Sequence, residues 1–125
     1  MKMKLEELVS PEASPALGPY CHGRKYGDMI ITSGQIPLTK DGEYVFEIKQ
    51  ATTLVLNNLL SIVEAGGGCR ESIARVDVYI KDLKDFGLIN EAYKEFFGEH
   101  KPTRVCVQVA AKLHPSPVSL PNDQI

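Results

Sequence analysis

Residues 73–80 read Ile-Ala-Arg-Val-Asp-Val-Tyr-Ile, a run in which apolar and polar side chains alternate. A period of two is typical of a β-strand with one face in the core and the other facing away from it. Val76, Val78 and Ile80 should therefore share the apolar face. Helical segments lie on both sides of this strand in the sequence, so the central part of the chain predicts helices packed against a sheet.

The two flanking segments have the period of an amphipathic helix. From about residue 47, apolar side chains recur at positions 48, 51, 55, 59 and 62, and three glycines at 66–68 are expected to end the helix. A second helix is expected from about 82 to 97, with Phe86, Ile89, Tyr93 and Phe96 on its buried stripe. Residues 103–110 then return to strand alternation, with valines on one face and Arg104, Cys106 and Gln108 on the other.

The N-terminal part predicts strands rather than helices. Candidate strands lie near 20–24 and 28–33, separated by a turn at Gly27-Asp28, and a short strand is expected around Tyr44. Strands followed by helix, strand, helix and strand predict an α+β sandwich, a mixed sheet with two helices on one face. Prolines crowd the tail after residue 113, so any strand there must be very short or at an edge.

Composition indicates one globular domain over residues 1–125. The apolar fraction is 43%, the charged fraction is 24% and the formal net charge is −2. No basic run favours nucleic acid and no apolar run is long enough to span a membrane. Three dispersed cysteines indicate free thiols and hence the cytoplasm. Metal signatures are absent from the three scattered histidines, so we expect no metal site.

Arg104 is the strongest candidate for a functional residue. It would share a strand face with Cys106, about 7 Å away along the strand, and its guanidinium could hold a carboxylate bidentately. An ordinary ion pair at the surface is the alternative for Arg104, and a small apolar filler is the alternative for Cys106. Asn90, at the margin of the second helical stripe, could be buried or solvated, and the Ser33-Gly34 pair could be a binding loop or an ordinary turn.

Five segments together resemble the reactive-intermediate deaminase family, RidA or YjgF. They occur in the family's order over roughly residues 8–113, at 18–20, 29–37, 78–83, 90–93 and 102–107. The resemblance implies a chorismate-mutase-like fold and a homotrimer with sites between subunits. It also implies hydrolysis of 2-imino acids such as 2-iminobutanoate and 2-iminopropanoate to 2-keto acids and ammonia, with no cofactor.

The same resemblance implies roles for individual residues. Arg104 would hold the substrate carboxylate, and Tyr20, Ser33, Gly34 and Asn90 would line the pocket. Backbone groups near Gly34 and Cys106 would orient the imine and the attacking water, which places Arg104, Cys106, Tyr20 and Asn90 in the catalytic set.

The tail, residues 114–125, departs from the family pattern. Where the family has a last strand with a glutamate facing the site, residues 116–121 read Ser-Pro-Val-Ser-Leu-Pro. A shifted reading frame and genuine divergence both fit this break. We therefore expect an intact binding pocket with weakened or absent turnover. Two alternatives remain: a non-catalytic regulatory protein that binds carboxylate metabolites, and an endoribonuclease or translation initiation inhibitor.

Overall fold

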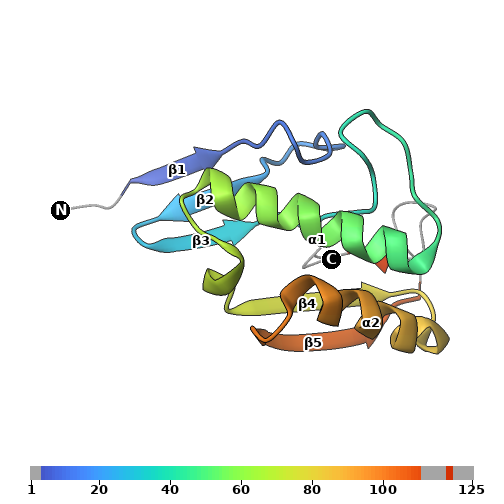
Figure 1. The fold of residues 1–125 in the computed structure, drawn as a ribbon. Helices are drawn as coiled ribbons and strands as arrows, with labels where there is room; N and C mark the ends of the chain where they lie inside the picture. The colour runs from blue at the N-terminus through green and yellow to red at the C-terminus, as the bar shows by residue number, and fades with distance from the viewer. Residues whose placement is uncertain (1–3, 111–117, 120–125) are drawn as a thin grey trace.

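The computed structural model describes residues 4–110 and 118–119 of the chain (Figure 1). Its regular elements follow the order strand–strand–strand–helix–strand–helix–strand–strand, and single 3-10 turns, η1 and η2, precede β4 and α2. The bounds are β1 Leu5–Leu8, β2 Gly23–Tyr26, β3 Met29–Thr32, α1 Ile48–Ala65, η1 Arg70–Ser72, β4 Arg75–Ile80, η2 Leu83–Asp85, α2 Phe86–Phe97, β5 Thr103–Gln108 and β6 Val118–Ser119.

The N-terminal strands form an antiparallel sheet in the order β1-β2-β3. Tyr26 pairs with Met29, so Gly27-Asp28 is a two-residue hairpin turn as predicted, and Gly27 has the positive φ of 61° that such a turn needs. The predicted strand at 20–24 is shifted, since β2 begins at Gly23 and leaves Tyr20 outside it. Strand β1 was not predicted, because Leu-Glu-Glu-Leu carries no alternation.

The second sheet has the order β5-β4-β6 and is mixed. Strands β4 and β5 run parallel, with Val78 beside Cys106, and the crossover between them passes through η2 and α2. Strand β6 pairs antiparallel with β4 over two residues, which confirms the expectation of a very short strand at an edge. Among the described residues these strands therefore form two three-stranded sheets.

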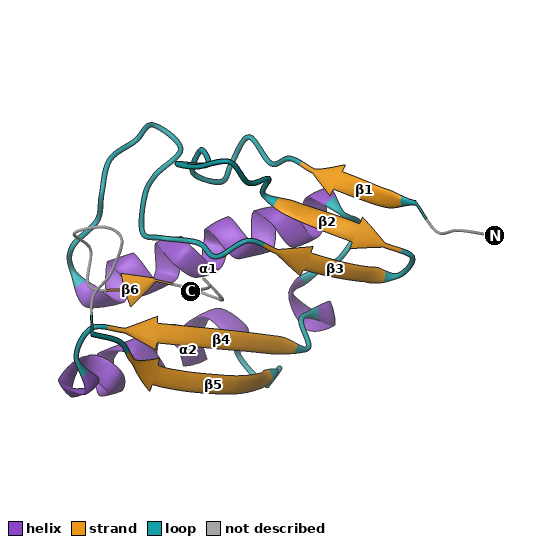
Figure 2. Ribbon diagram, turned by 180° about the vertical axis from the view of Figure 1, so that it is seen from behind, coloured by secondary structure: helices purple, strands orange, loops and turns teal. Residues whose placement is uncertain are grey.

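Both helices lie on the same side of the strands, as Figures 1 and 2 show from opposite directions. Helix α1 begins where the Glu47 carboxylate accepts the Lys49 and Gln50 backbone N–H groups, and its end is followed by Gly67 at φ 93°. The core between the helices and β4 is apolar and almost inaccessible, and it includes Val55, Leu56, Val76, Val78, Ile80 and Ile89. The predicted inner face of β4 is confirmed.

The segment after β3 is irregular but well anchored. The expected strand near Tyr44 is only a bridge between Leu38 and Tyr44. Asn58, 2% exposed on α1, donates from Nδ2 to the Leu38 carbonyl at 3.1 Å. Gln35, 3% exposed, donates from Nε2 to the Ser33 and Gly34 carbonyls, both at 3.3 Å. Buried amides thus replace ladder hydrogen bonds in this segment.

The sheet faces turned away from the helices are rich in exposed apolar side chains. The alternation along β5 places Val105 and Val107 on this outer face, while Arg104 and Cys106 point toward α2. In the N-terminal sheet, cross-strand pairing puts the exposed apolar residues of β1, β2 and β3 on one face. The exposed apolar residues of the two sheets are Leu5, Tyr26, Met29, Ile31, Val105 and Val107. We call this set the outer apolar face.

Candidate active site

Arg104 extends from β5 to one face of α2. Its Nη1 donates to Asn90 Oδ1 at 2.6 Å, and its Cζ lies 4.9 Å from the ring centroid of Tyr93 and 5.4 Å from that of Phe86. Within the part of the chain that the structure describes, Asn90 is its one hydrogen-bond partner and no carboxylate pairs with it. Among those residues the alternative of a surface ion pair is not formed, and the guanidinium N–H groups other than the one bonded to Asn90 have no partner there.

An open groove of 520 Å³ lies beside this guanidinium, lined by Leu83, Phe86, Arg104 and Cys106. Arg104 and Cys106 share the groove as the strand spacing predicted. The η2 turn that leads into α2 is fixed against the end of β5, because Gln108 Oε1 accepts the Leu83 backbone N–H at 2.9 Å. The groove therefore combines one cation with apolar walls.

Burial controls the titration of two groups near Arg104. Burial raises the pKa of the Cys106 thiol, and the nearby Arg104 charge lowers it by a smaller amount. Burial also raises the pKa of the Tyr93 hydroxyl, and the Arg104 charge lowers it by a smaller amount. Cys106 is thus a neutral thiol at neutral pH. Its contact with the core cluster also fits a packing role.

Tyr20, Ser33 and Gly34 form a second group in the N-terminal half. Ser33 Oγ donates to the Cys21 carbonyl at 2.6 Å, and the Ser33 backbone N–H donates to the His22 carbonyl at 2.9 Å. Tyr20 is 46% exposed, and its Oη accepts the Leu17 backbone N–H at 3.2 Å. These bonds hold the group in a defined conformation at the surface.

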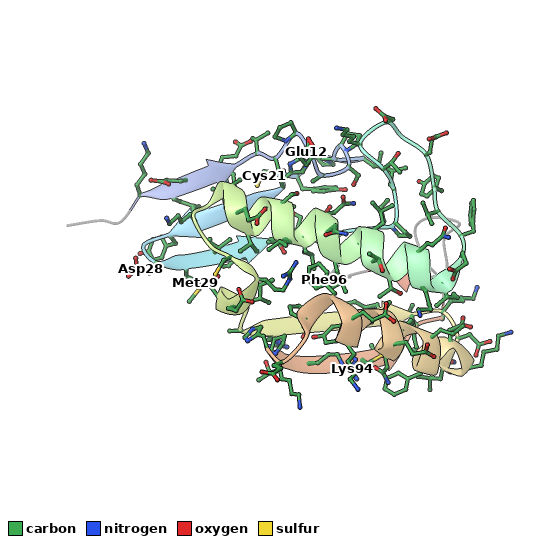
Figure 3. The ribbon with its side chains drawn as sticks, in the orientation of Figure 1. Glu12, Cys21, Asp28, Met29, Lys94 and Phe96 are labelled. Atoms are coloured by element: carbon green, nitrogen blue, oxygen red, sulfur yellow. The ribbon has the colours of Figure 1, made fainter. Side chains whose placement is uncertain are left out.

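Within one chain the two groups remain separate. In Figure 3, Cys21 lies in the half that holds β1–β3, whereas Phe96 and Lys94 mark α2 in the other half. Across residues 4–110 and 118–119, no hydrogen bond, ion pair or ring contact joins the Arg104 group to the Ser33–Gly34 group. The structure therefore brings together Arg104, Cys106 and Asn90 but leaves Tyr20, Ser33 and Gly34 apart from them.

Sequence reasoning did not assign the Arg104-facing side of α2 to the candidate site. Phe86 and Tyr93 were assigned only to a buried stripe, and Leu83 was not singled out. The spacing of Phe86, Asn90 and Tyr93, four and three residues apart, places all three on one helix face. An arginine on the neighbouring strand was the signal that this face could serve a site as well as the core.

No three His, Cys, Asp or Glu side chains of the described ranges lie close enough to hold a metal ion. None of the helices in those ranges is long and apolar enough to cross a membrane.

Comparison with known proteins identifies relatives over most of the chain. The model of the endoribonuclease L-PSP family matches residues 11–116. The 2-iminobutanoate/2-iminopropanoate deaminase of Escherichia coli K12 is 41% identical over 111 residues, which is 85% of this chain and 87% of that protein. A RutC family protein of Pyrococcus abyssi is 41% identical over 110 residues, 86% and 87% of the two chains.

Solved structures give the same answer for the fold. The crystal structure of E. coli TdcF with bound serine superposes with a TM-score of 0.89 at 39% identity, covering 92% of this chain and 94% of that one. The E. coli YjgF structure gives 0.88 at 36% identity, with 92% and 94% coverage. These comparisons agree with the five segments that resemble the reactive-intermediate deaminases. The chain therefore belongs to this family, RidA/YjgF, which is also described as the endoribonuclease L-PSP family.

Proposed function

We propose that the protein hydrolyses short 2-imino acids, such as 2-iminobutanoate and 2-iminopropanoate, to 2-keto acids and ammonia without a cofactor. The observation that carries the proposal is Arg104, a cation in an apolar-walled groove that has no carboxylate partner among the described residues. A bidentate carboxylate bond to such a group contributes about 1.5–3 kcal/mol. The named activity of the E. coli relative supplies the reaction class.

The chemistry needs little beyond positioning. Water adds to the C2 carbon of the protonated imine, and one of its protons moves to the nitrogen. The C–N bond then breaks and releases ammonia, while the remaining hydroxyl loses its proton and the C2–O bond becomes the keto group. A protonated imine is already electrophilic, so holding its carboxylate on Arg104 beside an ordered water supplies much of the rate. The family glutamate would assist proton transfer. Its absence from residues 116–121 leads us to propose reduced turnover with binding retained.

We propose further that the site is completed by a second copy of the chain in a homotrimer. The separation of the Arg104 group from Tyr20, Ser33 and Gly34 supports this, because one chain alone presents two incomplete halves. The outer apolar face supports it too, since exposed apolar side chains that share one face of a sheet favour association. The three free cysteines fit a reducing compartment, and we place the protein in the cytoplasm.

A coupled assay tests the deaminase proposal. A threonine dehydratase generates 2-iminobutanoate, and semicarbazide traps whatever imine survives. We expect the chain to reduce the trapped fraction and Arg104→Ala to abolish that effect. Lys94→Ala is the matched control, since it removes an exposed cation from α2, which also carries Asn90. Equal acceleration of imine loss by the wild type and by Arg104→Ala would refute the role of Arg104.

A second candidate is a binding protein without turnover. It is favoured by the relative whose structure holds serine, an amino acid with a carboxylate. Titration calorimetry with 2-ketobutanoate separates the two candidates. Binding that depends on Arg104, without any acceleration of imine loss, would select the binding protein.

A further inference from the structure

One face of α2 contacts the Arg104 guanidinium at three points. Phe86, Asn90 and Tyr93 occupy this face, and each meets the arginine through a different atom or ring. Asn90 makes a hydrogen bond, whereas Phe86 and Tyr93 offer the negative faces of their π systems. These contacts come from a single rigid helix, so their mutual positions are fixed.

The geometry places the guanidinium between the two rings. Phe86 and Tyr93 are seven residues apart, which is about 10 Å along a helix axis. The Arg104 Cζ lies 5.4 Å from one centroid and 4.9 Å from the other. A guanidinium at that point has limited freedom to swing toward either end of the helix, and the Asn90 bond at 2.6 Å limits its rotation about Cζ–Nε.

We propose that Phe86 and Tyr93 are positioning residues that hold Arg104 ready for a carboxylate ligand. The proposal rests on the proposed function for the nature of that ligand. A free arginine side chain loses considerable rotamer entropy when it is fixed by a ligand. Two aromatic contacts fix the side chain beforehand, so less of the binding free energy is lost on ordering it.

The ring of Tyr93, rather than its hydroxyl, carries this role. Tyr93 Oη is buried and has no hydrogen-bond partner among the described residues. The ring, in contrast, contacts Arg104 and also packs on Phe97, with centroids 4.8 Å apart. Tyr93→Phe should therefore restore what Tyr93→Leu removes.

The chain offers a matched control on the same helix. Phe96 contacts the Arg70 guanidinium at 4.8 Å from Cζ to the ring centroid, and Arg70 lies in η1. Phe96→Leu thus removes a comparable cation–π contact that does not involve the groove. Thermal unfolding of every variant shows whether it is folded before its kinetics are compared.

The first measurement is kinetic, made on the full chain in the imine-trapping assay. Loss of one aromatic contact should raise KM about tenfold in Phe86→Leu and in Tyr93→Leu, with a smaller change in kcat. Tyr93→Phe should return KM to within about threefold of wild type, and Phe96→Leu should not raise it. Unchanged KM in both groove variants, or equal increases in Phe96→Leu, would overturn the proposal.

The second measurement does not depend on the proposed function. Nitrogen-15 NMR of arginine side chains reports rotation of each guanidinium, and the Arg104 signals are identified by their loss in Arg104→Lys. We expect separate Hη resonances in the wild type and Tyr93→Phe, and averaged ones in Tyr93→Leu and Phe86→Leu. If the protein hydrolyses no imine but the spectra show these separate and averaged Hη resonances, the proposed function fails while the positioning role stands. Averaged Hη resonances in the wild type would refute the positioning role directly.

Discussion

Replacing the buried Asn58 of α1 is expected to destabilise the protein by removing the anchor of the segment after β3. Its Nδ2 donates to the Leu38 carbonyl at 3.1 Å and to the Ile36 carbonyl at 3.5 Å, and the second of these bonds is weak. Asn58→Leu deletes one good hydrogen bond and leaves a buried carbonyl without a donor. The lost bond contributes about 1 kcal/mol and the unsatisfied group costs about 1–3 kcal/mol, partly offset by the apolar side chain.

The net expectation for Asn58→Leu is a loss of about 1–3 kcal/mol in the free energy of unfolding. Asn58→Asp should cost more, about 3 kcal/mol, because it places carboxylate oxygens against carbonyl oxygens in the core. Urea unfolding followed by far-UV circular dichroism, at one protein concentration, measures both. Asn57 is the control, since it is the exposed neighbour on the same helix, and its Leu and Asp variants should stay within about 0.5 kcal/mol of wild type. Asn58→Asp as stable as wild type would refute the anchoring role.

Three further predictions each have a definite expected outcome. Gly23→Ala should lower the free energy of unfolding by about 1–3 kcal/mol, because its Cβ would lie 3.0 Å from the Ile31 carbonyl. Gly87→Ala on α2 is the control and should not destabilise the protein, because its Cβ would meet nothing within 4 Å. Thermal unfolding compares the two variants. Burial raises the pKa of the Cys106 thiol, so the unfolded chain loses that proton before the folded chain does as pH rises through 9.0. The free energy of unfolding should therefore fall in this pH range. It should fall less steeply in Cys106→Val, which has no thiol. A denaturation series from pH 7 to 10 measures this, and equal slopes would contradict it. Ile31→Glu, on the outer apolar face, should shift the light-scattering mass toward the monomer; an unchanged mass would show that this face is not the interface.

The helices and the inner strands were predictable because their periods are long and regular. The stripe of α1 and the alternation of β4 each specify one buried face, and the structure confirms both. Strand β5 shows where a period alone is insufficient. The valines on one face of β5 alternate as regularly as Arg104 and Cys106 on the other. Only the position of α2 determines that the face with Arg104 turns inward.

The candidate site was partly predictable for a related reason. Arg104 and Cys106 share a strand, so their spacing follows from local geometry. Phe86 and Tyr93 meet Arg104 only through tertiary packing across 11 or more residues of sequence, which a local pattern does not encode. The hydrogen bonds of Ser33 and Gln35 depend in the same way on segments whose backbone follows neither period.

The separation of Arg104 from Ser33 and Gly34 within one chain bears on how such a protein tolerates mutation. If neighbouring copies share each site, a chain damaged at Arg104 still offers a sound Gly34 half, and a chain damaged at Gly34 still offers a sound arginine. Random mixing of the two defective chains in equal amounts would then rebuild about a quarter of the sites. Conversely, a chain defective in both halves spoils two sites in any trimer that it enters. Alleles of this gene would thus complement or interfere with one another according to which half they affect.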